Sequence, residues 1–101
     1  MNIIIVGAGA IGSVVTVALA RAGADVTALL RPDAVAESTS LRMQVAALGG
    51  AQQWAIVPIA ATLSEEPDLV ILCVPAHTLA DACMVLAHLP AHIPVVALHG
   101  A

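Results

Sequence analysis

The hydrophobic residues of the chain fall into short runs that are separated by glycine, proline and charged residues. Runs that are almost wholly apolar over five or six positions are typical of strands buried on both faces of a parallel sheet. Proline ends two of these runs, because it cannot continue a central ladder. We therefore expect strands at residues 2–6, 25–30, 69–74 and 93–98.

Between these runs, apolar residues recur at helical spacing. Residues 10–22 carry them at Ile11, Val14, Val15, Ala18, Leu19 and Ala22, and Gly23 follows where a helix commonly ends. A second helix is expected over 78–89, with Thr78 as N-cap and Pro90 as its stop, and with an inward face of Leu79, Ala82, Cys83, Leu86 and Ala87. Pro32 and Asp33 open a third, short helix that extends to Ser38.

The middle of the chain has a different pattern. Two short strand-like runs, 41–47 and 53–59, lie either side of Gly49-Gly50 and predict a hairpin or meander. Elsewhere strands alternate with helices, which indicates βαβ units with right-handed crossovers. We expect one α/β domain over residues 1–101: a mainly parallel, doubly wound sheet with helices on both faces, in three α/β/α layers and truncated.

A glycine-rich turn joins the first expected strand to the first expected helix. It reads Gly7, Ala8, Gly9, Ala10, Ile11 and Gly12, which matches the pattern G-x-G-x-x-G. The pattern alone is weak, but between a buried strand and an amphipathic helix it indicates a dinucleotide site on a Rossmann-like fold. The first glycine permits the tight turn, the second lets a pyrophosphate approach, and the third lets the helix pack closely. The alternative is a glycine turn that binds nothing.

The end of the second strand indicates which dinucleotide is bound. A site for NAD would place a carboxylate there, on the ribose hydroxyls, whereas this chain has Arg31, with Asp33 two residues later. A guanidinium pairs with a 2′-phosphate, so we expect NADP(H) as the cofactor. The alternative is a solvated arginine at an exposed strand end.

Further candidate residues follow the later strands. Val74, Pro75 and His77 come after one of them and His99 after the last, at the end of the sheet where the nicotinamide half would bind. Each histidine is alternatively an ordinary loop residue. His88 and His92 are four apart, but Pro90 breaks the helix that would align them, so we expect no metal site.

Composition narrows the function further. Only 3 Lys and Arg stand against 7 Asp and Glu, for a net charge of −4, so we expect no nucleic-acid partner. The chain is 60% hydrophobic and 10% charged, which excludes disorder. Cys73 and Cys83 lie in apolar runs without C-x-x-C spacing, so we expect reduced core thiols and a cytoplasmic protein. Trp54, the single aromatic residue, is expected in the core or an interface.

A targeting segment is the main competing interpretation of the N-terminus. Residues 1–20 carry no charged side chain, and Ala18-Leu19-Ala20 resembles a cleavage site for a signal peptide. However, no basic residue precedes the apolar stretch, and three glycines interrupt it at the spacing of the dinucleotide turn. The same glycines argue against a membrane helix, so we expect no membrane partner.

With these motifs in view, the chain resembles the N-terminal NADP-binding domain of the ketopantoate reductases (2-dehydropantoate 2-reductases). The resemblance runs through IIIVGAGAIGSVV, VTALLRP, PDLVILCVPAH, TLADACMVLAHLP and PVVALHG, and is least over residues 33–61. It implies an oxidoreductase of pantothenate biosynthesis that reduces a 2-oxo acid, 2-dehydropantoate, with NADPH. It also implies pyrophosphate binding by Gly7 to Gly12 and 2′-phosphate binding by Arg31.

The same resemblance leaves catalysis unassigned. Family members typically carry a lysine where this chain has Pro75, and an asparagine where it has Gly100 or His99. Their catalytic lysine and substrate-binding carboxylate lie in a C-terminal helical domain that we expect this chain to lack. The chain is therefore expected to bind NADPH and to be incomplete for catalysis alone. Because a truncated sheet leaves apolar surface open, we also expect a homo-oligomer or a missing-domain partner. Two alternatives stay open: a non-enzymatic dinucleotide-sensing module, and an NADP-dependent reductase of the 6-phosphogluconate dehydrogenase-like group.

Overall fold

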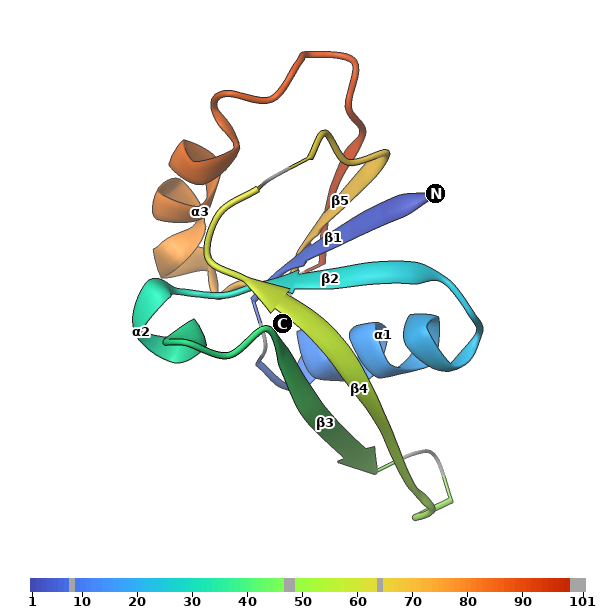
Figure 1. Ribbon diagram of the computed structural model, residues 1–101. Coiled ribbons are helices and arrows are strands. Elements are labelled where there is room, and N and C mark those ends of the chain that lie inside the picture. The colour runs from blue at the N-terminus through green and yellow to red at the C-terminus, as the bar shows by residue number, and fades with distance from the viewer. Residues whose placement is uncertain (8, 47–48, 64, 99–101) are drawn as a thin grey trace.

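A computed structural model describes residues 1–7, 9–46, 49–63 and 65–98 of the chain (Figure 1). The strands in this part are β1 (Asn2–Val6), β2 (Asp25–Leu29), β3 (Ser40–Ala46), β4 (Gln52–Ala60), β5 (Leu69–Leu72) and β6 (Val95–Ala97). The helices are α1 (Ala10–Arg21), α2 (Pro32–Val35) and α3 (Leu79–Leu86), and a short 3-10 turn, η1 (Ala76–Thr78), leads into α3.

The strands form one mainly parallel sheet in the order β3-β4-β2-β1-β5-β6. β1 lies at the centre and pairs in parallel with β2 on one side and with β5 on the other. The expected hairpin is present, because β3 and β4 are antiparallel, and β4 also joins the sheet by pairing in parallel with β2. The α/β doubly wound fold predicted from the sequence is confirmed.

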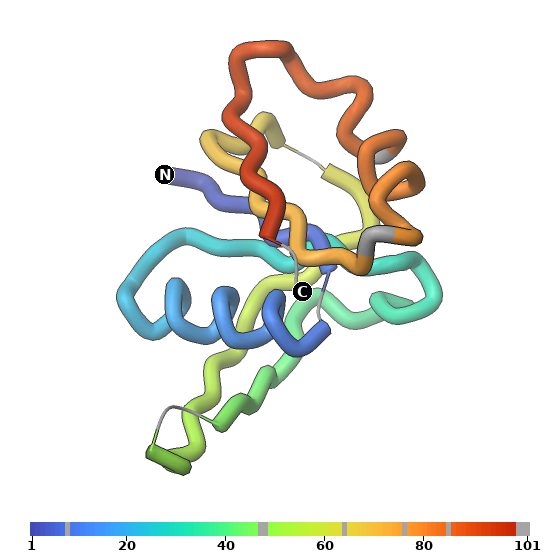
Figure 2. Tube along the Cα trace, turned by 180° about the vertical axis from the view of Figure 1, so that it is seen from behind, coloured from blue at the N-terminus to red at the C-terminus, as the bar shows by residue number. Residues whose placement is uncertain are grey.

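Alternate residues of the central strands point to opposite faces, and each face has its own core. Ile3 and Ile5 of β1 pack with Val17 of α1, and Ile4 and Val6 pack with Ala82 of α3. The two views of the backbone show α1 and α3 on opposite sides of the sheet (Figures 1 and 2). The three predicted layers are therefore those observed.

The ends of the helices differ from the expected positions. α3 ends at Leu86 rather than at residue 89, and α2 ends at Val35 rather than at residue 38. Thr78 precedes α3 as expected, but its hydroxyl donates to the carbonyl of Pro75 (2.9 Å) and does not cap the helix. This hydrogen bond closes η1. The hydroxyl of Thr78 is therefore not available to cap α3.

Two residues expected on the inner face of α3 are exposed. Cys83 and Ala87 face away from the sheet, whereas Ala82 is buried at 8% exposure. The helix is apolar on several sides, so its pattern does not single out one face. The prediction that Cys83 is a core thiol was therefore wrong, and that for Cys73, exposed by 7%, is confirmed.

α1 buries a polar residue that its apolar pattern did not suggest. Thr16 is fully buried, because its hydroxyl donates to the carbonyl of Gly12 (2.6 Å) in the preceding turn. Ile11 and Val14 remain 39% and 49% exposed on the outer side of the helix. Within the described ranges, no helix has the length and apolar character needed to cross a bilayer.

Candidate functional site

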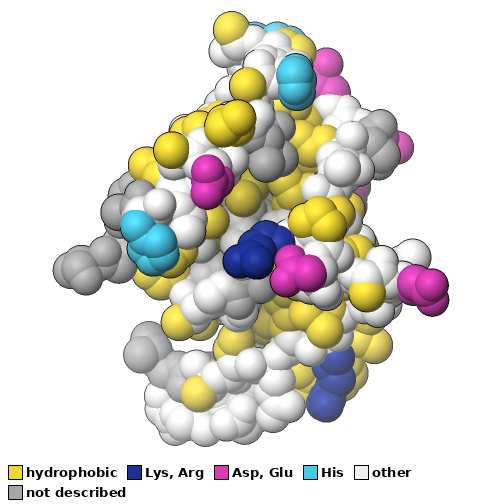
Figure 3. Space-filling model, turned by 90° about the vertical axis from the view of Figure 1, so that its left-hand side faces the viewer, with side chains coloured by type: hydrophobic (Ala, Val, Ile, Leu, Met, Phe, Trp, Pro, Cys, Tyr) yellow, Lys and Arg dark blue, Asp and Glu magenta, His cyan; other side chains and the backbone are white. Residues whose placement is uncertain are grey.

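The carboxyl ends of the parallel strands meet at one edge of the sheet, and the candidate residues follow them. Val6 of β1 is level with Leu29 of β2 on one side and with Leu72 of β5 on the other. The chain runs outward from β1 through β2 to β4 and then returns to β5, so the strand order reverses between β1 and β5. In open α/β sheets, ligands bind outside the carboxyl ends of the strands at such a reversal. Figure 3 looks onto this edge.

Gly7 and Gly12 are required by the protein's own packing. Gly7 has a φ of +101°, and a Cβ there would lie 2.6 Å from the carbonyl oxygen of Cys73. A Cβ on Gly12 would overlap the carbonyl of Gly7 and would lie 3.1 Å from the Cβ of Cys73. These two glycines let the turn and the start of α1 lie directly against the end of β5. Their presence is explained without a ligand.

Gly9 differs from its two neighbours in the motif. Its φ is −69°, which any residue adopts, and a Cβ placed on it has no heavy atom of the described residues within 4 Å, its two neighbours in the chain aside. Neither backbone strain nor internal packing therefore requires a glycine at this position. Open space directly at the start of α1 is what a pyrophosphate needs if it is to approach the backbone.

In the described part of the chain, neither a side-chain cap from Gly9 nor an acidic side chain occupies the start of α1. Gly9 is the N-cap and supplies no side-chain hydrogen bond, and no acidic residue lies in the first turn. The first backbone N–H groups of a helix lack intrahelical acceptors, and the helix dipole is positive at this end. The 12-residue length of α1 gives a full dipole. This end therefore suits a phosphate group chemically.

Arg31 lies just after β2, next to the end of β1 in the sheet. Its side chain is 85% exposed, and its Nε lies 3.4 Å from an Oδ1 of Asp33, which is 73% exposed. The sequence placed both residues here but gave no signal that they pair. An exposed pair of this kind contributes only about 0–1 kcal/mol, so the guanidinium remains available to a stronger anion. The other two arginines, Arg21 and Arg42, both contact Trp54.

The residues after β5 lie against the glycine turn. A Cγ1 of Val74 is 3.0 Å from where a Cβ on Gly7 would stand, so Val74 borders the turn. Pro75 is exposed, and its carbonyl accepts bonds from the backbone and hydroxyl of Thr78. His77 is exposed in η1. The predicted positions Ala8 and His99 lie outside the described residues.

Cys73 is a contact of the glycine turn that the sequence motif did not reveal. Its backbone N–H donates to the carbonyl of Val6 (2.8 Å), and its carbonyl and Cβ face Gly7 and Gly12. Burial raises the pKa of the Cys73 thiol, so the group stays neutral beside the turn. The only signal in the sequence for this contact with the glycine turn is a small apolar residue directly after β5.

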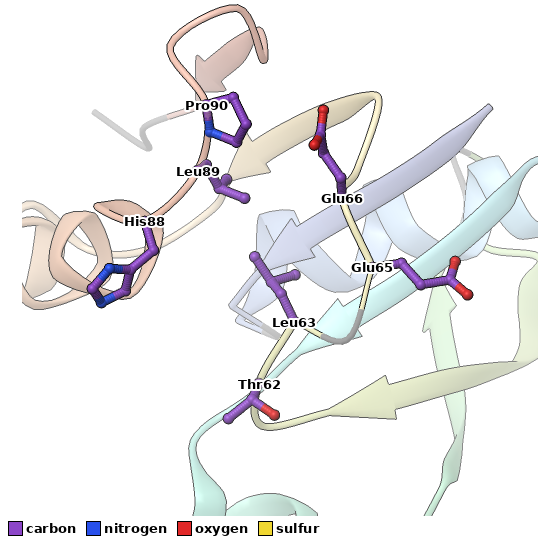
Figure 4. A pocket seen from close by; sticks show the side chains of 7 residues that line it. All are labelled: Thr62, Leu63, Glu65, Glu66, His88, Leu89 and Pro90. Atoms are coloured by element: carbon purple, nitrogen blue, oxygen red, sulfur yellow. The ribbon is translucent and has the colours of Figure 1, made fainter.

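A shallow hollow lies elsewhere on the molecule, between the connection from β4 to β5 and the connection from α3 to β6 (Figure 4). Leu63 and Leu89 point toward the gap between the two connections, and Glu65 points away from it. Neither the glycine turn nor Arg31 lines the hollow. The carboxylates of Glu65 and Glu66 at its border do not suit a polyanionic dinucleotide.

His92 and Trp54 both have partners at the surface. Nε2 of His92 lies 3.0 Å from Oε1 of Glu66 at the surface. Over the described ranges, no group of three or more His, Cys, Asp or Glu residues is placed to hold a metal ion. Trp54 is 47% exposed, so the expectation of a core position was wrong, and the guanidinium of Arg42 lies 4.7 Å from its ring centre. The expectation of an interface at Trp54 is not tested by these contacts.

A family model described as ketopantoate reductase PanE/ApbA matches residues 3–99. The chain belongs to this family. Ketopantoate reductases use a nicotinamide dinucleotide as cofactor. A search of the curated proteins found no match.

Solved structures of ketopantoate reductases have the same fold. The chain is similar to a PanE/ApbA family ketopantoate reductase from Ralstonia eutropha JMP134, with 29% identity and a TM-score of 0.77 over 99% of this chain and 34% of that one. It also resembles 2-dehydropantoate 2-reductases from Methylococcus capsulatus (24%, TM-score 0.75) and Geobacter metallireducens GS-15 (24%, TM-score 0.69), with the same two coverages. The chain thus spans about a third of the length of these reductases and corresponds to their N-terminal domain.

Proposed function

We propose that this chain binds NADPH and forms the cofactor half of a ketopantoate-reductase-type oxidoreductase. The family reaction is the reduction of 2-dehydropantoate to pantoate in pantothenate biosynthesis, which we assign to the protein as a whole. The bound dinucleotide would supply the hydride. The residues of this chain would bind and orient it: the turn from Gly7 to Gly12, with Arg31, Val74, Pro75 and His99 around it.

Gly9 is the observation that supports this proposal best. Among the contacts of the described residues, none explains a glycine at this position, and Gly9 supplies no side-chain cap to a helix whose first turn has no acidic residue. A ligand that needs close approach to the backbone accounts for a glycine at this position, and a pyrophosphate is such a ligand. The neutral Cys73 thiol adds no negative charge beside it.

Arg31 supports NADPH over NADH. It is exposed at the strand end next to β1, where the adenosine ribose of a dinucleotide on the glycine turn would lie. Exchange of its weak contact with Asp33 for a charge-assisted contact with a 2′-phosphate would contribute about 1.5–3 kcal/mol, or roughly ten- to hundred-fold in affinity. The opposing net charge of −4 acts mostly through screened solvent.

The proton that completes the reduction needs a different source. Val74 and Pro75, the described side chains that border the turn after β5, have no group that donates a proton. Substrate binding and proton donation are accordingly assigned to other groups of the whole protein. Two free thiols, at Cys73 and Cys83, suit the reducing cytoplasm, where we place the protein.

Calorimetric titration of the purified chain with NADPH, and separately with NADH, tests the proposal. We expect saturable binding of both, with NADPH bound at least ten-fold more tightly. No saturable binding of either would refute the dinucleotide site, and tighter binding of NADH would refute the role of Arg31. Oxidation of NADPH in the presence of 2-dehydropantoate then separates a complete reductase from a module that binds cofactor without turnover.

A further inference from the structure

The outer side of β3 is an unguarded edge of the sheet. The strand order places β3 at one edge and β6 at the other. β3 spans 7 residues and pairs with β4 without a break from Ser40 to Ala46, whereas β6 spans 3 residues. In the part of the chain that the structure describes, β3 therefore offers the longer row of unpaired backbone groups. Such a row is a template for pairing with another strand.

The hydrogen-bonding pattern shows which residues of β3 present these groups. The backbone N–H of Ile59 donates to the carbonyl of Thr39 (3.0 Å), just before the strand. Because antiparallel pairs alternate, the odd-numbered residues of β3 face β4 and the even-numbered residues face outward. Pro58, which is opposite Ser40 and has no N–H, agrees with this alternation. The outward groups belong to Ser40, Arg42, Gln44 and Ala46, all of which are exposed.

β3 lacks the features that usually protect an edge strand. Its sequence, SLRMQVA, contains no proline, lysine or acidic residue, and its register contains no bulge. Its single charge, on Arg42, lies over the ring of Trp54 on the neighbouring strand, 4.7 Å from the ring centre. The guanidinium therefore lies over the face of the sheet, where it does not block the approach of another strand to the edge.

We propose that β3 pairs antiparallel with β3 of a second copy of this chain, about a two-fold axis at Met43. Outward groups must meet outward groups, so an even-numbered residue must lie opposite an even-numbered residue. Centring on Met43 satisfies this over the whole strand. Ser40 then lies opposite the partner's Ala46, and Arg42 lies opposite the partner's Gln44.

Strand overlap and charge together select this register over its neighbours. A shift of two residues toward the C-terminus places Arg42 opposite the partner's Ala46 and shortens the overlap. A shift of two residues toward the N-terminus places Arg42 opposite the partner's Arg42, which opposes like charges and shortens the overlap. A shift of one residue turns the wrong backbone groups toward each other and reverses the faces. In the Met43 register, the one charged residue of the strand meets a neutral amide. The pairing also joins the exposed apolar side chains of Trp54 and Ile56 in both copies to one sheet face.

Opposite substitutions at Gln44 test the register. Gln44→Glu places a carboxylate opposite the partner's Arg42 at both symmetry-related positions, and Gln44→Arg places a like charge there. Each cross-strand pair changes the free energy by about 0.2–1 kcal/mol, so two pairs change the dimer dissociation constant roughly two- to thirty-fold. Sedimentation equilibrium should show a lower constant for Gln44→Glu and a higher constant for Gln44→Arg.

Gln52 provides the matched control. It is exposed on β4 and accepts a hydrogen bond from Nε2 of Gln44 (3.1 Å), but it does not lie on the outer edge. Gln52→Glu and Gln52→Arg carry the same changes of charge and should leave the dissociation constant unchanged. Equal effects at positions 44 and 52 would indicate a general charge effect and would overturn the register.

Amide hydrogen exchange of the unmodified 101-residue chain, resolved by residue, tests the pairing directly. As the concentration rises, the amides of Ser40, Arg42, Gln44 and Ala46 should become protected, whereas those of Leu41, Met43 and Val45 are protected by β4 throughout. Gln44→Pro removes one outward N–H without removing a bond to β4, so it should weaken the dimer. A monomer at every concentration, or a dimer whose even-numbered amides stay unprotected, would overturn the proposal.

Discussion

A Cβ on Gly7 would lie 2.6 Å from the carbonyl oxygen of Cys73, so the turn after β1 rests on the bare backbone at the end of β5. The N–H of Gly7 also donates to the carbonyl of Leu29 at the end of β2 (3.2 Å). The turn is therefore held on both sides by the two strands that flank β1. The sheet therefore positions Gly7, the first residue of the turn.

Gly7→Ala and Gly12→Ala should both destabilise the fold. At Gly7 the added methyl group meets a carbonyl oxygen at a positive φ, and at Gly12 it meets the carbonyl of Gly7 and the Cβ of Cys73. We expect each change to lower the free energy of unfolding by about 1–3 kcal/mol. Urea denaturation followed by circular dichroism measures this loss. Wild-type stability in both variants would contradict the close packing of the turn.

Gly9→Ala should separate binding from folding. The added methyl group has no atom within 4 Å in the part of the chain that the structure describes, adjacent residues aside, so we expect the free energy of unfolding to change by less than about 1 kcal/mol. The same methyl group would stand where the pyrophosphate approaches, and NADPH affinity should fall roughly five- to hundred-fold. Calorimetry and denaturation of the same sample provide both numbers. Unchanged affinity would place the dinucleotide elsewhere.

Arg31→Ala should weaken NADPH binding roughly ten- to hundred-fold and alter NADH binding much less, because only NADPH carries the 2′-phosphate. Asp33→Asn is the complementary change. It removes the carboxylate that lies 3.4 Å from the Nε of Arg31, so NADPH affinity should rise by about two- to five-fold. Parallel titrations with both cofactors measure the two effects. Equal losses for NADPH and NADH in Arg31→Ala would indicate that Arg31 does not recognise the 2′-phosphate.

The two thiols should react at very different rates. Cys83 is exposed, whereas Cys73 is 7% exposed and burial raises its pKa. Iodoacetamide should therefore alkylate Cys83 first and should reach Cys73 only in denaturant. Mass spectrometry of digested samples locates the label. Rapid labelling of Cys73 in the folded chain would show that the turn opens readily.

The raised pKa of Cys73 also sets the sign of a pH effect on stability. The thiol ionises at its ordinary pKa in the unfolded chain but only at a higher pH in the folded chain. The contribution of the buried thiol to the free energy of unfolding is fully present below the ordinary pKa of cysteine. This contribution is lost as the pH rises above that value. Denaturation between pH 7 and 10 should show this loss, and Cys73→Ala should reduce it.

Trp54 should report on Arg42, because it is the single aromatic residue of the chain. Arg42→Met keeps an extended side chain but removes the cation from the ring, and should lower the free energy of unfolding by about 0.5–1 kcal/mol. The emission of Trp54 should shift at the same time. Arg21→Ala is the control, because Arg21 donates to the backbone carbonyl of Trp54 (3.2 Å) and not to its ring, so it should leave the emission nearly unchanged.

The order of strands and helices was predictable because strong local signals mark it. The apolar run at β1, the glycine turn and the left-handed Gly23 (φ +87°) after α1 all lie where the sequence placed them. The face of α3 was not predictable, because alanine, cysteine and methionine there differ little in hydropathy. Burial of Thr16 was missed for another reason: its hydroxyl is satisfied within its own helix.

The candidate site could be predicted from the sequence only at positions where a residue type has a single structural role, such as glycine in a tight turn. Gly7 and Gly12 were identified by spacing, and the structure adds that Cys73 is what they pack against. The contact between Arg31 and Asp33 depends on the turn into α2, which the pattern did not resolve in detail. The parallel pairing of β4 with β2 joins segments far apart in the chain, and no local signal encodes it.

The central place of β1 has a consequence for synthesis on the ribosome. β2, which pairs with one side of β1, follows it closely in the chain. The other side of β1 pairs with β5, which begins directly after Asp68. The carboxylate of Asp68 accepts a hydrogen bond from the backbone N–H of Asn2, 66 residues earlier. A growing chain therefore holds its first strand half paired until β5 emerges. The antiparallel β3–β4 ribbon, by contrast, joins near neighbours and closes early. Vectorial folding would thus complete the packing of the glycine turn against the end of β5 late, after the β3–β4 hairpin has formed.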